Sequence, residues 1–165
     1  MANRTLIALA FLVLVPASVH AAVSKASQDF VTAAGTAGTY EVAAGELATQ
    51  RATSPDVKTF GRLMVTDHTK ANAMLKAIAG SIPVPDTLDA KHAKLLAELE
   101  AAPSAEFDAT YLKQQRQAHE EAVALFKKES AEGDDPALKS FAESTLPTLE
   151  KHLEMVQALE KGAAK

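Results

Sequence analysis

The feature that most constrains this chain is a set of long stretches in which apolar or small residues recur every three or four positions. That spacing draws one face of an α-helix. Proline-containing breaks separate the stretches, and proline either ends a helix or occupies its first position. The breaks are Thr53-Ser54-Pro55, Gly80 to Pro85, Pro103-Ser104 and Glu132 to Pro136. The pattern predicts long helices over 27–51, 55–79, 104–132 and 136–161, and a shorter one over 87–102.

The lengths of the connections predict how these helices are arranged. The first and second long helices are joined by a short turn, as are the third and fourth, so each pair should be antiparallel. About 25 residues, including the short helix, lie between the pairs, and a connection of that length can cross a bundle from end to end. We therefore predict an all-α, ferritin-like four-helix bundle with an additional short helix between the second and third long helices.

Individual residues sharpen the predicted helix boundaries. Ser54 is the expected N-cap of the second long helix, and Ser104 that of the third. Pro147 lies inside the last helical stretch. It removes one backbone hydrogen bond, which predicts a bend there or, alternatively, a break of the helix.

The first 21 residues have the pattern of a secretory signal peptide. Arg4 supplies a positive start, the apolar run Leu6 to Val15 follows, and Val19-His20-Ala21 provides short residues before cleavage after Ala21. Residues 22–165 then form a single domain that is exported, either periplasmic or associated with the outer membrane. The apolar run is shorter than the roughly 20 residues of a membrane span, so no transmembrane span is expected in the mature chain; the alternative is a signal retained as an anchor.

Composition excludes several classes of function. The formal net charge is −4, with no stripe of Lys and Arg interleaved with aromatics, so no nucleic-acid partner is expected. The absence of cysteine excludes disulfides, thiolate metal sites and thiol catalysis. No nucleophile elbow or phosphate-binding glycine loop is present. The pattern does not favour an enzyme, and it indicates no particular protein partner.

Most charged residues lie off the apolar stripes, but two carboxylates and three imidazoles lie on them. These residues are Glu41, Asp67, His68, His119 and His152. His92 lies instead among lysines on the short helix and is predicted to be solvated. Because an unpaired carboxylate is costly to bury among alanines and leucines, the five stripe residues need a purpose.

The heights of these residues along the helices agree. Glu41 is 13 residues before Ser54 and Asp67 is 13 after it, so the two face each other in an antiparallel pair. His119 is 15 residues before Asp134 and His152 is 18 after it. That offset of three residues is about 4.5 Å along a helix. The four faces therefore converge on one central layer.

Two interpretations of this layer remain open. The residues form a site for one transition-metal ion, since imidazole and carboxylate together suit zinc, iron, copper, nickel or manganese. Alternatively, they form a metal-free hydrogen-bond network in a structural or stress-related module. Asp67 is predicted inside its stripe and His68 at the edge. At 100° per residue the two point apart, so both are not expected to reach one point. A redox enzyme is a third hypothesis, which the sequence supports least.

The chain resembles an exported bacterial family of unassigned function, domain of unknown function 4142, whose members are often labelled membrane or outer-membrane proteins. The resemblance covers about residues 27 to 160. It rests on Glu41-Val42, Gly45-Glu46-Leu47-Ala48, Met64-Val65-Thr66-Asp67-His68, Asn72, Phe107-Asp108-Ala109-Thr110-Tyr111, His119, Leu125-Phe126, Phe141-Ala142 and Leu146-Pro147-Thr148-Leu149-Glu150-Lys151-His152-Leu153. It implies a ferritin-like bundle outside the cytoplasm.

The resemblance does not imply ferritin chemistry. Ferritin-type di-iron sites use Glu-x-x-His motifs, whereas Val65 and Leu149 stand three residues before His68 and His152. Ferroxidase or oxygenase activity is therefore not expected. A site for a single metal ion, or no metal site, fits these residues better.

Overall fold

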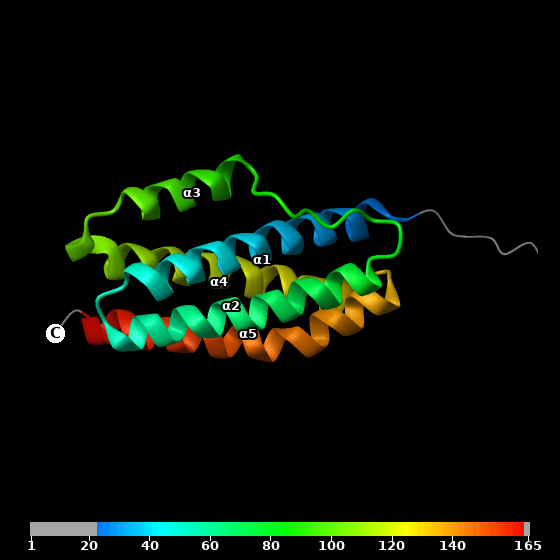
Figure 1. The fold of residues 1–165 in the computed structure, drawn as a ribbon. Coiled ribbons are helices and arrows are strands. Elements are labelled where there is room, and N and C mark those ends of the chain that lie inside the picture. Colours follow the sequence, from blue (N-terminus) through cyan, green and yellow to red (C-terminus); the bar gives the residue numbers. More distant parts are fainter. Residues whose placement is uncertain (1–22, 164–165) are drawn as a thin grey trace, which may run out of the picture.

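The computed structural model describes residues 23–163, and the predicted signal peptide lies outside the described residues. Within them the chain forms helices and no strand, which confirms the all-α prediction. The helices are α1 (Lys25–Arg51), α2 (Pro55–Ile78), α3 (Ala90–Ala101), α4 (Ser104–Glu132) and α5 (Pro136–Ala163) (Figure 1). None of the helices in this described part is long and apolar enough to cross a membrane.

The four long helices form a bundle in which each contacts two others. Helix α1 packs along α2 and α4 packs along α5, while α1 also contacts α4 and α2 contacts α5. The chain between α2 and α4 returns along the length of the bundle, with α3 lying on the outside of α1 and α4 (Figure 1). This single long crossover is the connection predicted from the length of that segment.

Side-chain caps explain where most helices begin. Ser24 Oγ accepts the backbone N–H of Ser27, and Ser54 Oγ accepts that of Val57. Asp89 accepts the N–H of His92, so α3 begins at Ala90 and not at the predicted residue 87.

Two expectations about helix boundaries are wrong. Ser104 was expected to cap α4 but is its first residue. Pro103 holds the cap position, where no side chain accepts a backbone hydrogen bond. The alternative of a break at Pro147 is also wrong, because α5 runs through it. Pro147 is exposed on the outside of the bundle, so its ring fits there without displacing core side chains.

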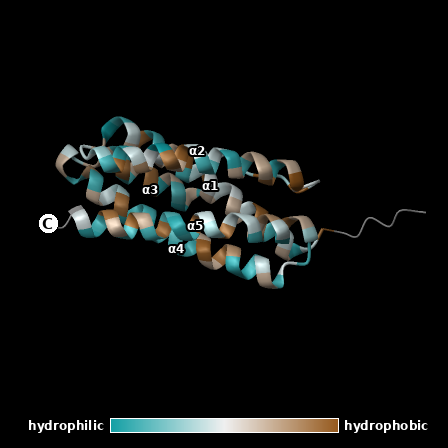
Figure 2. Ribbon diagram, turned by 90° about the horizontal axis from the view of Figure 1, so that it is seen from below, coloured by the Kyte–Doolittle hydropathy of each residue, from teal (hydrophilic) through white to brown (hydrophobic). Residues whose placement is uncertain are grey.

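The bundle interior contains two apolar clusters. The first apolar cluster includes Tyr40, Ala44, Ala48, Phe60, Met64, Phe107, Tyr111 and Val156. The second apolar cluster includes Phe30, Val31, Leu75, Phe126, Leu138, Phe141 and Leu149. On α2, α4 and α5 the polar stripe residues fall between the residues of these two clusters, and on α1 Glu41 directly follows Tyr40 of the first cluster. Figure 2 shows hydrophobic residues recurring along each helix with hydrophilic ones between them.

Glycines allow α1 and α2 to approach closely. A Cβ atom on Gly61 would lie 2.9 Å from the carbonyl oxygen of Gly45, and one on Gly45 would lie 2.8 Å from that of Gly61. At Gly38, an added Cβ would lie 2.0 Å from the side-chain oxygen of Asn72. This close approach fixes the register of α1 against α2, and with it the height of Glu41 relative to His68.

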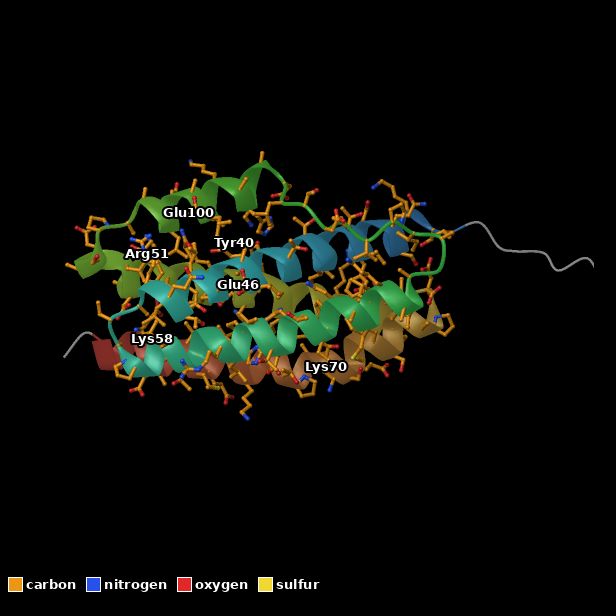
Figure 3. The ribbon with its side chains drawn as sticks, in the orientation of Figure 1. Tyr40, Glu46, Arg51, Lys58, Lys70 and Glu100 are labelled. Carbon is orange, nitrogen blue, oxygen red and sulfur yellow. The ribbon has the colours of Figure 1, made fainter. Side chains whose placement is uncertain are left out.

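Arg51 ties the end of α1 to the end of α3. Its guanidinium donates to the carbonyl oxygens of Leu99, Glu100 and Ala102 at the C-terminus of α3. The same group lies 4.8 Å from the centre of the Phe107 ring. Figure 3 shows Arg51 between these two elements. The crossover is thereby held against the bundle.

Candidate metal centre

Three histidines from three different helices converge in the middle of the bundle. His68 on α2, His119 on α4 and His152 on α5 each offer a ring nitrogen within 4.8 Å of the nitrogens offered by the other two. All three are buried, with His119 and His152 each 1% exposed. His119 Nε2 and His152 Nδ1 lie 3.4 Å apart.

Neighbouring acceptors fix the protonation of two of these rings. His119 Nδ1 lies 2.9 Å from the carbonyl oxygen of Gln115, one turn earlier on α4. His152 Nε2 lies 3.0 Å from Oδ2 of Asp67. A carbonyl and a carboxylate can only accept, so both of these nitrogens carry a proton. In the neutral rings, His119 Nε2 and His152 Nδ1 then present their lone pairs to each other.

Two lone pairs facing each other at 3.4 Å repel unless a cation lies between them. A tetrahedral ion with metal–nitrogen bonds of 2.0–2.1 Å holds neighbouring nitrogens about 3.3 to 3.4 Å apart. The alternative is a second proton on His152, which would then donate to His119 and pair with Asp67.

Burial opposes that second proton. It lowers the pKa of His152 below the ordinary value, with the Asp67 carboxylate acting in the opposite direction. Burial also lowers the pKa of His119 to about 4 and that of His68 well below its usual range. Three neutral imidazoles, the form that binds metals, are therefore favoured at neutral pH.

His68 completes the cluster from α2. It follows Val57, Phe60, Gly61 and Met64 on the buried face of that helix. Its ring centre lies 5.5 Å from that of His119 and 5.6 Å from that of His152. Its Nε2 atom is buried and has no hydrogen-bond partner. Buried polar atoms are usually paired, so this unpaired imidazole nitrogen is available to a metal ion or to another ligand.

Glu41 brings a carboxyl group to the same layer from α1. Its Oε1 atom lies 3.8 Å from His119 Nδ1, and its Oε2 atom is buried without a partner. Burial raises the pKa of Glu41 to about 8, against a smaller opposing effect of Gln115. In the metal-free protein the carboxyl group is therefore mostly neutral at pH 7.

The two sides of the histidine cluster differ. On one side the Phe60 ring packs against His119 and His152, with ring centres 6.5 and 6.4 Å apart. On the other side lies a cavity of about 40 Å³, lined by Glu41, Asp67, His68 and His152 together with side chains of the second apolar cluster. One buried water needs about 10–15 Å³ of such space. The cavity therefore has room for more than one small ligand atom.

The structure places all five predicted site residues in this layer. The burial of His68 and Asp67, however, is the opposite of the prediction. His68 was expected at the edge and is 7% exposed, whereas Asp67, expected inside, has a side chain 32% exposed. The buried face of α2 packs against α1 and α5, and His68 lies on that face. Asp67 does not join the nitrogens but contacts the His152 ring from its outer edge.

Sequence reasoning missed two parts of the site and misplaced one histidine. The Gln115 carbonyl and the Phe60 ring were not identified, although Gln115 stands one turn before His119, where its carbonyl can accept from the ring. His92 is not solvated as expected, because its side chain is 13% exposed and bonds to Asp89, 2.7 Å away. Its ring also packs 5.3 Å from that of Tyr40.

Comparisons with known proteins place the chain by fold and family. A search of curated proteins found no significant match. A solved structure, described as a crystal structure of a DUF305 fragment from Deinococcus radiodurans, is similar over 84% of this chain and 97% of its own, with a TM-score of 0.73 and 14% identity. That likeness supports the helical bundle. Residues 14–159 match the family described as Domain of unknown function (DUF4142), and the chain belongs to that family.

Proposed function

We propose that this protein binds one divalent transition-metal ion through His68, His119 and His152. The observation that carries the proposal is the pair of ring nitrogens 3.4 Å apart, each left with a lone pair by the acceptor on the opposite edge of its ring. The unpartnered Nε2 of His68 supports it as the third nitrogen.

The surroundings of the histidines also suit a metal. Ligating histidines usually donate their other N–H to a carboxylate or backbone carbonyl, which fixes the ring and raises its basicity. Asp67 and the Gln115 carbonyl are in those positions. Three imidazole ligands suit zinc, copper, nickel or iron. We take zinc as the reference ion because it accepts a tetrahedral site with three protein ligands.

The test compares two histidine variants. The metal content of the protein, purified without a tag or chelator, is measured by plasma mass spectrometry, and zinc affinity by calorimetry. We expect about one metal ion per chain, with affinity falling at least about 100-fold in His119→Ala/His152→Ala. His92→Ala is the matched control, because His92 lies on α3 outside the cluster. A wild-type protein that takes up no metal after reconstitution with zinc, copper, iron and manganese would refute the proposal.

A second function is a structural module whose central layer is a metal-free network. The 3.4 Å separation favours it if His152 carries both protons and donates to His119. In that case zinc would leave the unfolding temperature unchanged. A metal that binds only the folded state raises stability by RT ln(1 + [L]/Kd), so the thermal shift separates the two functions.

We further propose that the protein acts outside the cytoplasm, in the periplasm or at the outer membrane. Support comes from the signal pattern of residues 1–21. Mass spectrometry of the protein from its native host should find a mature chain beginning at Ala22. A chain that retains residues 1–21 would indicate an uncleaved anchor, and a cytoplasmic fraction would overturn export.

A further inference from the structure

Resting on the proposed metal site, we infer that the bound ion keeps a fourth, exchangeable position that takes a small anion from the cavity beside Glu41. The protein would then be a receptor for an ion and a second ligand, and not a closed structural metal site. The juxtaposition of three histidines, a carboxyl group without a partner and an internal cavity points to this arrangement.

The histidine cluster supplies three protein ligands and not four. Three nitrogens lie within 4.8 Å of one another, and neither Glu41 nor Asp67 belongs to that group. Asp67 is used at the outer edge of His152, and Glu41 Oε1 lies 3.8 Å from the protonated Nδ1 of His119. Catalytic and exchangeable zinc sites have three protein ligands, whereas structural ones have four.

The open position of the ion faces the cavity. Phe60 packs against His119 and His152 and closes the side toward the first apolar cluster. The cavity is lined by His68 and His152 on the side of the second apolar cluster, so a fourth ligand has space there. Its walls include Ala34, Ala37 and Gly38 of α1 and Ala122 of α4, whose small side chains keep the space open.

The charges around the ion favour an anion as the fourth ligand. A divalent ion held by three neutral imidazoles keeps both positive charges, and the nearest carboxylate, Asp67, offsets one of them through His152. A monovalent anion would offset the other. Glu41 lines the cavity and its Oε2 atom is buried without a partner, so its carboxyl group, when protonated, can donate a hydrogen bond to that anion.

The cavity also has a route to solvent. Thr148, which is exposed, and Thr145, which is half-buried, line it from α5, and the partly exposed Asp67 lines it from α2. A small anion could enter between these two helices and displace a water molecule from the ion. A cavity of about 40 Å³ accepts an ion of two or three heavy atoms.

The test uses the full mature protein loaded with Co²⁺, a spectroscopic substitute for zinc, and sodium azide as the anion. Metal content is measured first, and the visible Co²⁺ spectrum is then followed during azide titration. We expect a saturable spectral change with one azide per cobalt. Ala37→Leu, which fills the cavity from α1, should retain cobalt and weaken azide binding at least about tenfold. Ala33→Leu, exposed one turn earlier on the same helix, is the matched control.

The outcomes separate this inference from the proposed function. Stoichiometric cobalt with no spectral response to azide would overturn the open position and leave the metal site standing. Glu41→Gln provides a second measurement. If it lowers cobalt affinity as strongly as His119→Ala, Glu41 is itself the fourth ligand and the inference is wrong. If cobalt is retained and only azide binding weakens, the inference holds. Failure of cobalt and zinc to bind would overturn both proposals.

Discussion

The central polar layer and the two apolar clusters that flank it follow different physical rules. In the second apolar cluster, Phe30, Phe126 and Phe141 pack with ring centres 5.2 to 6.5 Å apart, and removal of their surface from water explains their positions. In the layer, Glu41 and His68 each bury a polar atom without a partner. Such burial costs free energy. The apolar clusters therefore stabilise the fold, whereas the role of the polar layer is to bind a ligand or to specify how the helices pair.

The largest effect that would sharpen this contrast is expected in the first apolar cluster. Phe107 is completely buried, stacks on Tyr111 and lies under Arg51. Phe107→Ala should lower the free energy of unfolding by about 3–5 kcal/mol, measured by urea denaturation. Zinc affinity should be unchanged, because Phe107 belongs to the first apolar cluster and not to the histidine cluster. An equal loss of zinc affinity would show that cluster and layer are not independent.

A smaller loss is expected from added volume in the same region. A Cβ at Gly61 would lie 2.9 Å from the Gly45 carbonyl oxygen and 2.9 Å from the Ala48 side chain, and the backbone of α1 cannot yield cheaply. Gly61→Ala should therefore lower the free energy of unfolding by about 3 kcal/mol.

Gly162→Ala is the matched control, since a Cβ there meets nothing within 4 Å. In a helix, exchanging glycine for alanine without a clash stabilises by up to about 1 kcal/mol. The two substitutions should therefore change the free energy of unfolding in opposite directions. A neutral Gly61→Ala would show that α1 and α2 can separate, and the register that sets the height of Glu41 would be less tightly fixed.

The predictability of the two regions also differs. Helix number, order and crossover follow from proline breaks and from apolar spacing, because burial acts on whole faces and tolerates small errors in angle. The position of Asp67 relative to His68 did not follow, because it depends on how α2 is rotated between α1 and α5. That rotation is set by tertiary contacts such as that between Gly45 and Gly61. The periodicity of a single helix cannot predict such contacts, because they depend on the neighbouring helix.

The level of the histidines could be predicted from the sequence, but the orientation of their rings could not. That His119 and His152 share a level could be predicted by counting residues from the turn. Which nitrogen of each ring faces inward could not, because it depends on the Asp67 carboxylate and the Gln115 carbonyl. The cavity was equally hidden, since small side chains on several helices enclose it together.

The smallest expected effect concerns the polar layer and its dependence on pH. Burial raises the folded-state pKa of Glu41 from 4.5 to about 8. The stability that this group contributes is therefore present below about pH 4.5 and is lost as pH rises through about 8. The buried imidazoles act in the opposite direction, because their folded pKa values are lowered. Their contribution is present above about pH 6.5 and is lost as pH falls below that value.

Above about pH 6.5, Glu41 should therefore be the one group of this layer whose ionisation changes the stability. Chelator-treated wild-type protein should lose about 1.4 kcal/mol of stability per pH unit from there, and about 2 kcal/mol by pH 8. Glu41→Gln keeps the shape but cannot ionise, so subtracting its urea denaturation curves at each pH isolates the effect. Equal slopes for the two proteins would mean that Glu41 is already ionised in the folded state. A carboxylate buried there requires a charged imidazole beside it, so that result would favour the metal-free network and weaken the proposed metal site.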